Sequence, residues 1–521
     1  MNKIYSLEDA VSLVGDGDLI AGTGIVMSGV AEEVFKALEA KFLSTGHPAE
    51  LTGMFGSGQG NWEDGAWEHL AHEGMLKRVI GGHYATCAKI GRMINANQVE
   101  AYNLPQGMFM RMYRNAAKNV TGELTKLGIR TFVDPRLEGG KLNPVTTEDI
   151  VHLVEFKGEE WLYYDTPKIN IALIRGTMAD PNGNISLEEE ILPLDMLAVA
   201  MAAKAGGGKV IVQVKYIAEA GSMAASRVDI PGIFVDAVVV SREPELNHRQ
   251  TQQYYYQPSM SGHVNVPLDS IPLLPLNEKK VLCRRAAMEL TSNAVVNLGI
   301  GTPEGVANVA NEEGIGNQMI LTSESGVVAG VPCGGKAFGA VQNAWGFLDM
   351  PNQFDFYDGG GLDISILGLA QVNSKGDVNV SKFGPKVAGC GGFINITQNT
   401  KKLVYCGTFT AGGLKLEIGG GKLTILQEGR AKKFINKVEQ VTYSGEFGAE
   451  SKQEVLYVTE RAVFELTAEG LLLTEIAPGV DLQKDILDQM EFAPIVAKDV
   501  RTMVERLFRD EPIGLKALLG V

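Results

Sequence analysis

The sequence lacks the signatures of several common classes of protein. Its five cysteines, at positions 87, 283, 333, 390 and 406, include no CxxC pair and have no neighbouring pair of histidines. This spacing argues against a zinc site and a disulfide framework and fits a reducing compartment, so we expect a cytoplasmic protein. No run of about 18 apolar residues occurs, so we predict no membrane span. Acidic residues follow directly after residues 1–6, and no long apolar core appears there, so we expect no signal peptide.

Positive charge is also scarce. The 521 residues carry a formal net charge of −15 and contain no basic stripe, which argues against nucleic acid as a partner. An acidic chain can still bind a polyanion through backbone N–H groups and a few local lysines or arginines.

Motifs for nucleophilic, metal or dinucleotide chemistry are incomplete. There is no G-x-S-x-G elbow, and the seven histidines, at positions 47, 69, 72, 83, 152, 248 and 263, leave residues 264–521 without one. His69 and His72 are spaced i, i+3, but no carboxylate or cysteine pattern completes a metal site, so we expect a satisfied or exposed pair and no metal. The Gly-Gly-Gly-Lys runs at 206–209 and 419–422 lack the Ser or Thr of a P-loop.

What the sequence does contain is glycine in clusters and short apolar runs between helical stretches. The 62 glycines show no collagen period. β-Branched runs at 169–175, 209–214 and 237–240 are bounded by turns and separated by helical patterns. This alternation predicts an α/β protein with mostly parallel sheets.

Two halves of the chain resemble each other. Residues 19–24 and 296–301 each read as a strand that runs into a glycine turn before a helix, and residues 172–186 echo 366–380. We therefore predict two similar open α/β domains, produced by internal duplication and facing a shared active-site cleft. The boundaries we predict are an N-terminal domain at 1–245, a proline-containing linker at 246–277 and a C-terminal domain at 278–521.

Helix-start residues and the spacing of apolar residues give three local predictions. Residues 6–9 (Ser-Leu-Glu-Asp) favour a helix start, with Ser6 as the cap. Residues 415–475 alternate apolar and polar side chains and favour β-hairpins. Residues 484–519 favour a helical segment that covers the second domain.

The most unusual carboxylate lies in residues 319–332. An apolar run, 319–321, favours a short buried strand, and it leads into small polar residues around Glu324. Gly326 and Gly330 allow a sharp turn close to a ligand. An exposed Glu in an ordinary turn is the alternative reading of these residues alone.

Two glycine loops could bind an anion. Residues 299–305 follow a predicted strand and open a helix, which places unpaired N–H groups and a helix dipole toward a ligand. The third glycine is one residue late for G-x-G-x-x-G, which argues against a dinucleotide. Residues 389–393, preceded by Lys386, could form an oxyanion hole. For both loops, a simple tight turn is the alternative.

Over essentially its full length the chain resembles a family I CoA-transferase, most closely the single-chain acetate/propionate type. The motifs that carry the resemblance occur at 297–303, 322–326, 354–361, 367–371 and 389–395, with 104–107 in the first half. The resemblance places Glu324 at the family's catalytic glutamate. It implies ping-pong exchange of CoA between a short-chain acyl-CoA and a free short-chain carboxylate, with coenzyme A as substrate and as a covalent glutamyl-CoA thioester, and with no permanently bound cofactor.

The resemblance also implies roles for other residues. Gly391 and Gly392 would stabilise the oxyanion through their N–H groups, and Gln106 would hydrogen-bond the acid. The expected CoA contacts are Asn297, Gly299, Ile300, Gly301, Thr302, Gly389 and Lys386. The family implies acyl-CoA and short-chain acids as partners, and a homo-oligomer.

One departure from the family pattern is present. Ketoacid-transferring members often carry Ala-Lys-Gly where this chain has Ala411, Gly412 and Gly413, so we expect Lys386, Lys401 or Lys402 to replace that lysine. The sequence leaves the acid open among acetate, propionate, butyrate, lactate and acrylate. An acyl-CoA thioester hydrolase and a non-catalytic acyl-CoA-binding protein remain the alternative functions.

Overall fold

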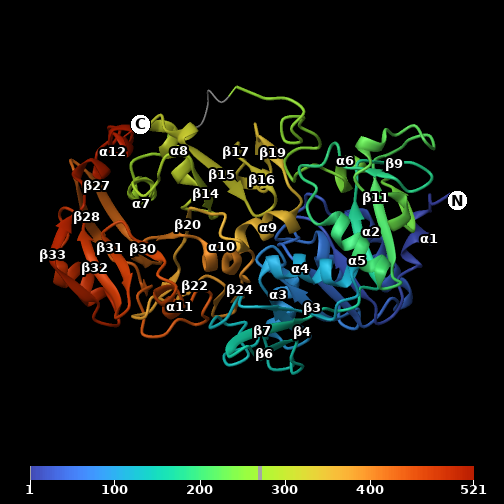
Figure 1. The fold of residues 1–521 in the computed structure, drawn as a ribbon, viewed down its shortest axis with the longest axis horizontal. Coiled ribbons are helices and arrows are strands. Elements are labelled where there is room, and N and C mark those ends of the chain that lie inside the picture. The colour runs from blue at the N-terminus through green and yellow to red at the C-terminus, as the bar shows by residue number, and fades with distance from the viewer. Residues whose placement is uncertain (1, 268–272, 521) are drawn as a thin grey trace. The chain divides into compact units, whose positions relative to one another are not determined.

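The computed structural model describes residues 2–267 and 273–520, which form two compact units (Figure 1). Unit 1 comprises residues 1–266, 324–355 and 384–395, and unit 2 comprises 267–323, 356–383 and 396–521. Each unit is therefore discontinuous in sequence. The continuous domains predicted at 1–245 and 278–521 stay a prediction. Of the predicted linker, residues 268–272 lie outside the described residues.

Unit 1 is built on a parallel sheet with strand order β13-β11-β8-β1-β2-β3-β4. Its strands are β1 (Leu19–Gly22), β2 (Leu51–Phe55), β3 (Leu76–Gly81), β4 (Glu100–Asn103), β8 (Ile171–Arg175), β11 (Lys209–Val214) and β13 (Ala237–Val240). All five residues of β8 are buried, as expected for a parallel strand covered on both faces. The apolar run predicted at 169–175 is thus confirmed as a central strand.

Helices cover this sheet and complete its core. They are α1 (Leu7–Val11), α2 (Glu32–Thr45), α3 (Ala88–Asn95), α4 (Gln106–Ala117), α5 (Met196–Ala205) and α6 (Pro244–Asn247). The predicted start of α1 is confirmed, because the Ser6 side chain accepts a hydrogen bond from the Asp9 N–H at 3.0 Å. Trp67 is fully buried, and its ring stacks on Phe55 with centroids 4.9 Å apart.

Unit 1 also carries several short sheets and hairpins. β5 (Gly122–Thr125), β7 (Glu159–Asp165) and β6 (Val151–Phe156) form one small sheet, and β9 (Met178–Ala179), β10 (Ile185–Ser186) and β12 (Tyr216–Ile217) form another. In the segment 324–355, β16 (Val327–Val328) pairs with β19 (Gly346–Phe347), and β17 (Val331–Pro332) pairs with β18 (Val341–Gln342). α9 (Met350–Asp358) begins at the end of this segment.

Unit 2 contains a mixed sheet in which β15, β14, β20, β25 and β30 are adjacent and parallel. β31 and β32 continue it as an antiparallel hairpin, and β33 adds in parallel to β32 (Figure 1). The strands are β14 (Ala294–Leu298), β15 (Met319–Ser323), β20 (Ile364–Gly368), β25 (Lys402–Cys406), β30 (Glu454–Val458), β31 (Ala462–Thr467), β32 (Gly470–Ile476) and β33 (Ile495–Thr502).

The two sheets share one strand order. In unit 1 the order β2-β1-β8-β11-β13 matches β15-β14-β20-β25-β30 in unit 2, each series following the same sequence of connections. A short hairpin follows the third strand in both, β9–β10 after β8 and β21 (Gln371–Val372) with β22 (Val378–Asn379) after β20. The predicted α/β class and internal duplication are confirmed. The shared cleft stays a prediction.

The other elements of unit 2 include one confirmed hairpin and one correction. The helices are α7 (Glu278–Ala287), α8 (Gly305–Glu312), α10 (Phe393–Asn399, which begins in unit 1), α11 (Gly445–Glu450) and α12 (Leu515–Leu519). β27 (Lys415–Gly419) and β28 (Lys422–Gln427) form a predicted hairpin. The continuous helix predicted over 484–519 is wrong, because this segment contains β33. Pro494 lacks the N–H that a helix interior needs, and β-branched Ile495 and Val496 follow it.

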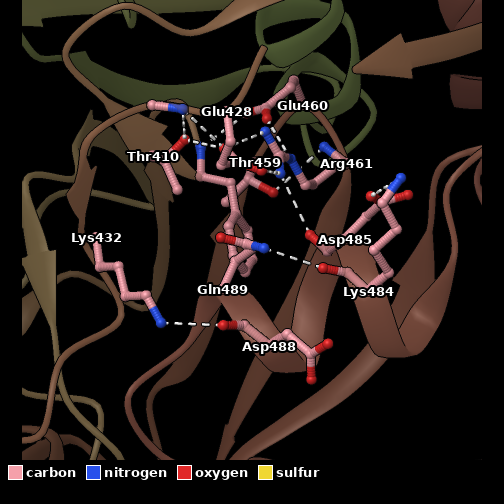
Figure 2. Close-up of polar contacts among 12 residues, drawn as sticks. Thr410, Glu428, Lys432, Thr459, Glu460, Arg461, Lys484, Asp485, Asp488 and Gln489 are labelled. Atoms are coloured by element: carbon pink, nitrogen blue, oxygen red, sulfur yellow. Dashed lines mark hydrogen bonds and ion pairs between the residues drawn. The ribbon is translucent and has the colours of Figure 1, made fainter. Parts of the chain in front are cut away.

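A buried charged cluster connects several segments of unit 2 that are distant in sequence (Figure 2). The Arg461 guanidinium lies between Glu460, whose Oε1 is 2.7 Å from its Nε, and Glu428, whose Oε2 is 2.6 Å from its Nη1. Arg461 also donates to the backbone carbonyl of Asp485 at 3.2 Å, and Thr410 donates to Glu428. Because the Arg461 and Glu460 side chains are wholly inaccessible, this cluster is structural.

All five cysteines are free thiols. Four are buried, and Cys333 is half-buried. Burial raises the pKa of Cys87 to about 12 and raises those of Cys390 and Cys406 further. These thiols are therefore protonated and unreactive near neutral pH.

Within the described residues, no helix combines the length and the apolar character needed to cross a membrane. The same part of the chain shows no group of three or more His, Cys, Asp or Glu side chains placed to hold a metal ion. His69 and His72 are instead satisfied by carboxylates, His69 by Glu32 and Glu39 and His72 by Glu39.

Candidate active site

Glu324 lies in a turn at the end of a strand. β15 ends at Ser323, and residues 324–326 turn the chain into β16. The carboxylate-bearing residue is half-buried, whereas Ser325 and Gly326 beside it are buried. The predicted strand and turn are confirmed. The catalytic role of Glu324 stays a prediction from the family pattern.

Gly326 is required by the geometry of this turn. Its φ is +113°, and a Cβ at this position would lie 2.1 Å from the backbone oxygen of Leu348. The Leu348 N–H donates to the Gly326 carbonyl at 2.7 Å, so the two backbones are in direct contact. Glycine is the residue that accommodates both the dihedral angle and the close approach.

Gln106 and the loop at 389–392 lie together in unit 1. Gln106 is the first residue of α4, its N–H donates to the Gly391 carbonyl at 2.8 Å, and its side chain is buried. A Cβ on Gly391 would lie 3.8 Å from Gln106 Oε1. Unit 1 also contains Glu324. The predicted catalytic residues therefore belong to one compact unit.

The two predicted oxyanion donors differ in whether their N–H groups already donate a hydrogen bond within the protein. The Gly391 N–H donates to the Gly82 carbonyl at 2.7 Å and is already engaged in the protein. The Gly392 N–H has no acceptor among the described residues and directly precedes α10. The oxyanion role of both residues stays a prediction, and Gly392 is the donor better placed to reach a ligand.

Asn103, at the end of β4, organises this loop and was missed from sequence. Its fully buried amide donates to the carbonyls of Gly81 and Gly82 at 2.8 and 2.7 Å and accepts from the Cys390 N–H at 2.9 Å. Gly389, with φ +83°, allows the approach, because a Cβ there would lie 2.9 Å from Asn103 Nδ2. A single Asn carries no sequence signal for such a role.

The loop predicted to bind CoA lies in unit 2, at the end of β14. The Gly299 N–H donates to the Ile366 carbonyl at 2.8 Å, and a Cβ on Gly299 would lie 3.1 Å from Leu367 Cδ2. Ile300 and Gly301 are exposed. The N–H groups of Ile300, Gly301 and Thr302 have no protein acceptor within the described residues, so this loop before α8 can receive an anion.

Asn297, unlike the exposed residues of that loop, is buried and hydrogen-bonded. It is buried, and its amide donates to the Thr322 carbonyl and to the Tyr357 hydroxyl, both at 3.3 Å. The Tyr357 hydroxyl donates in turn to Thr322 Oγ1 at 2.9 Å. The predicted CoA contact of Asn297 stays a prediction. The observed contacts hold Thr322 of β15, two residues before Glu324.

Comparison with known proteins identifies the family. The profile of the family described as "Coenzyme A transferase" matches residues 4–241. Caffeate CoA-transferase of Acetobacterium woodii is 45% identical over 525 aligned residues, covering 100% of both chains. The acetate CoA-transferase YdiF of Escherichia coli K12 is 43% identical, covering 98% of this chain and 96% of its own. This chain belongs to the coenzyme A transferase family.

The fold of this CoA-transferase agrees with that assignment. Two crystal structures of the acyl-CoA transferase YdiF from E. coli O157:H7 superpose with TM-scores of 0.92 and 0.90 at 41% identity, covering 98% of this chain and 97% of theirs. The first is an apoenzyme, and the second is a thioester complex with CoA. The protein is thus an enzyme that uses CoA as a substrate.

The three lysines expected to replace the family lysine lie at different places in the structure. In the transferase, Lys401 pairs with Asp363 at 2.7 Å and Lys402 pairs with Glu289 at 2.5 Å, and both stand at the start of β25. The CoA loop stands at the opposite, carboxyl edge of the sheet. Lys386 is exposed in unit 1.

Lys433 was not considered from sequence and lies at the carboxyl edge. Its ammonium donates to the Leu369 carbonyl at 3.2 Å and to Thr408 Oγ1 at 3.3 Å, just beyond the ends of β20 and β25. Burial lowers the pKa of Lys433, although the charge of Glu460 opposes this.

Proposed function

We propose that this transferase exchanges CoA between a short-chain acyl-CoA and a free short-chain carboxylate through a glutamyl-CoA thioester on Glu324. The observation that carries the proposal is Glu324 in a glycine-dependent turn, in the same compact unit as Gln106 and Gly392. The CoA thioester complex of the 41% identical YdiF supports the covalent step.

The reaction proceeds through balanced acyl transfers. The Glu324 carboxylate attacks the thioester carbonyl, the C–S bond breaks, and an acyl–glutamyl anhydride and CoA thiolate result. The thiolate attacks the glutamyl carbonyl of the anhydride, and the acid leaves as its carboxylate. An acceptor carboxylate then reverses these steps. A carboxylate nucleophile conserves the activation because anhydride and thioester are both reactive, whereas a serine ester is more stable.

The oxyanion of each tetrahedral intermediate needs a donor. We assign this to the Gly392 N–H, since the Gly391 N–H already donates to Gly82. Gly391 takes part through its carbonyl, which accepts the Gln106 N–H and so places the Gln106 side chain beside the acid.

Coenzyme A requires an anion site. We assign its binding to the loop of Gly299, Ile300, Gly301 and Thr302, whose N–H groups have no acceptor in the described part of the chain. Lys433 lies at the same edge of the unit 2 sheet and is a better replacement for the missing lysine than Lys401 or Lys402, which are paired at the other edge.

The acid is proposed to be acetate or propionate, with tolerance of related acids. One relative of similar identity is an acetate CoA-transferase and another is a caffeate CoA-transferase, so overall identity does not separate these substrates. A pocket distinguishes one methylene by about 1–3 kcal/mol, which favours broad specificity. A homo-oligomer and a cytoplasmic location stay predictions.

Mass spectrometry of the covalent intermediate tests the mechanism. After incubation with propionyl-CoA and digestion, the peptide containing Glu324 should carry CoA. Glu324→Gln should lose exchange by several orders of magnitude while it still binds CoA, because the amide lacks the nucleophilic oxygen. Persistent exchange in Glu324→Ala would refute the assignment. Release of free CoA without an acceptor acid, as fast as exchange, would instead identify a thioester hydrolase.

A further inference from the structure

His83 lies at the carboxyl end of the unit 1 sheet, where open α/β sheets bind ligands. It follows β3 by two residues, after Gly81 and Gly82. Gly82 allows a close crossing of backbones, because a Cβ there would lie 1.8 Å from the Gly56 oxygen. No role has yet been assigned to this histidine.

Backbone hydrogen bonds fix His83 against the glycine loop on both sides. The residue before it, Gly82, accepts the Gly391 N–H at 2.7 Å, and the residue after it, Tyr84, donates to the Ala388 carbonyl at 2.7 Å. His83 is thus held between two contacts to the same four-residue stretch. The position of its Cα depends on the loop that carries the proposed oxyanion donor.

The imidazole ring and the Gln106 side chain both lie near Gly391. A Cβ on Gly391 would lie 3.6 Å from His83 Cδ2 and 3.8 Å from Gln106 Oε1. On the other side of the ring, a Cβ on Gly58 would lie 2.7 Å from His83 Nδ1. The absence of a side chain at Gly58 therefore makes room for this ring, whereas the Gly391 distances are ordinary van der Waals contacts that place the ring near Gln106.

The two ring nitrogens of His83 make no hydrogen bond with the described residues. The imidazole of His83 is half-buried and has no hydrogen-bond or ion-pair partner among the described residues, unlike the paired His69, His72 and His248. Burial, assisted by the charge of Lys386, lowers the pKa of His83 to about 4. At neutral pH the ring is therefore uncharged, with one N–H donor and one acceptor nitrogen.

We propose that His83 is a further substrate-binding residue of the active site, and that its imidazole hydrogen-bonds a carboxyl oxygen of the acid beside Gln106. This inference rests on the proposed function for the identity of the ligand. A neutral ring suits the task because its N–H can hydrogen-bond an acid oxygen without the cost of burying a positive charge.

Equilibrium binding of propionate to the free enzyme tests the proposal without turnover. Affinity is measured by ligand-observed NMR in wild type, His83→Phe and His83→Gln. His83→Phe keeps a planar ring of similar size but removes both nitrogens, and should weaken propionate binding by about 10- to 100-fold. His83→Gln restores a donor and should recover part of the affinity. His152→Phe, on the exposed strand β6, is the matched control and should change nothing.

The same samples separate substrate binding from structural support. CoA affinity and melting temperature should be unchanged in His83→Phe, and the KM for the acid should rise more than kcat falls. Unchanged propionate affinity in His83→Phe would overturn the proposal. Equal losses of propionate affinity, CoA affinity and melting temperature would also overturn it in favour of a packing role. The proposed function is judged separately, by the Glu324–CoA adduct in wild type.

Discussion

At the scale of single residues, Gly326 shapes the turn that contains Glu324. A methyl group at Gly326 would meet the Leu348 oxygen at 2.1 Å, and its φ of +113° is unfavourable for any side chain. We predict that Gly326→Ala shifts this turn and lowers exchange at least about 100-fold, since misplacing a reacting group by about 1 Å has an effect of that size. Steady-state exchange kinetics measure the loss.

A matched glycine provides the control for this prediction. Gly334 has no atom within 4 Å of a built Cβ and no positive φ, so Gly334→Ala should keep wild-type kinetics. CoA affinity should survive in both variants, because the CoA loop lies at the end of another strand, β14. Full exchange activity in Gly326→Ala would show that the turn tolerates the clash and does not position Glu324.

At the scale of elements, Arg461 holds together the segments shown in Figure 2. Arg461→Met leaves Glu460 and Glu428 without their cation in a buried environment. Breaking a buried ion pair in this way typically lowers the free energy of unfolding by about 3–5 kcal/mol. Chemical denaturation should show that loss.

The comparison for Arg461 is an exposed pair of the same types. Arg509 contacts Glu505 at 3.1 Å with both side chains largely exposed, so Arg509→Met should change the free energy of unfolding by at most about 1 kcal/mol. Equal effects of the two substitutions would contradict a structural role for the buried cluster.

The His69 contacts predict a pH dependence of stability. His69 Nε2 lies 3.0 Å from Glu32 and its Nδ1 lies 2.6 Å from Glu39, so the protonated ring donates to both. Burial lowers the pKa of His69, but the hydrogen bonds and charges of Glu32 and Glu39 outweigh it and raise the pKa above 6.5. The stabilisation is therefore complete below pH 6.5 and is lost as pH rises through the folded-state pKa.

A pH series of denaturation experiments tests this sign. The difference in free energy of unfolding between wild type and His69→Gln should be largest near pH 6 and should shrink at alkaline pH. A difference that grows as pH rises would show that the neutral ring is the stabilising form.

Sequence predicted the elements whose signal is local. The strand before Glu324 and the glycine turn after it follow from residue type, although only Met319 and Thr322 of that strand are buried. The repeated strand–turn patterns predicted the duplicated strand order. The helix prediction over 484–519 was wrong because β33 forms by pairing with β32, and local sequence patterns do not reveal such pairing. Asn103 and His83 were missed for the same reason, since their roles arise from contacts with residues 388–391 nearly 300 positions away.

At the scale of the whole molecule, the chain passes repeatedly from one compact unit to the other. Segments 324–355 and 384–395 belong to unit 1, where the Met350 N–H donates to the Leu194 carbonyl and the Tyr84 N–H donates to the Ala388 carbonyl. Residues 1–266 alone would lack these segments and would expose apolar surface that they cover. We predict that this fragment aggregates when expressed alone.

Coexpression supplies the missing segments in trans. Fragments 1–266 and 267–521 should copurify from one cell through a tag on either fragment, and exchange activity should return with the complex. A soluble, cooperatively melting 1–266 fragment would show that unit 1 does not need the exchanged segments.

The buried thiols have a practical consequence for spectroscopy. Because four of the five cysteines are buried and Cys333 is half-buried, Cys333→Ser leaves a background that maleimide dyes should not label in the folded enzyme. A single new cysteine in place of Ile300, which is 61% exposed in the predicted CoA loop, then provides an attachment site for an environment-sensitive fluorophore. Arrival and departure of the nucleotide could be followed in real time by stopped-flow emission.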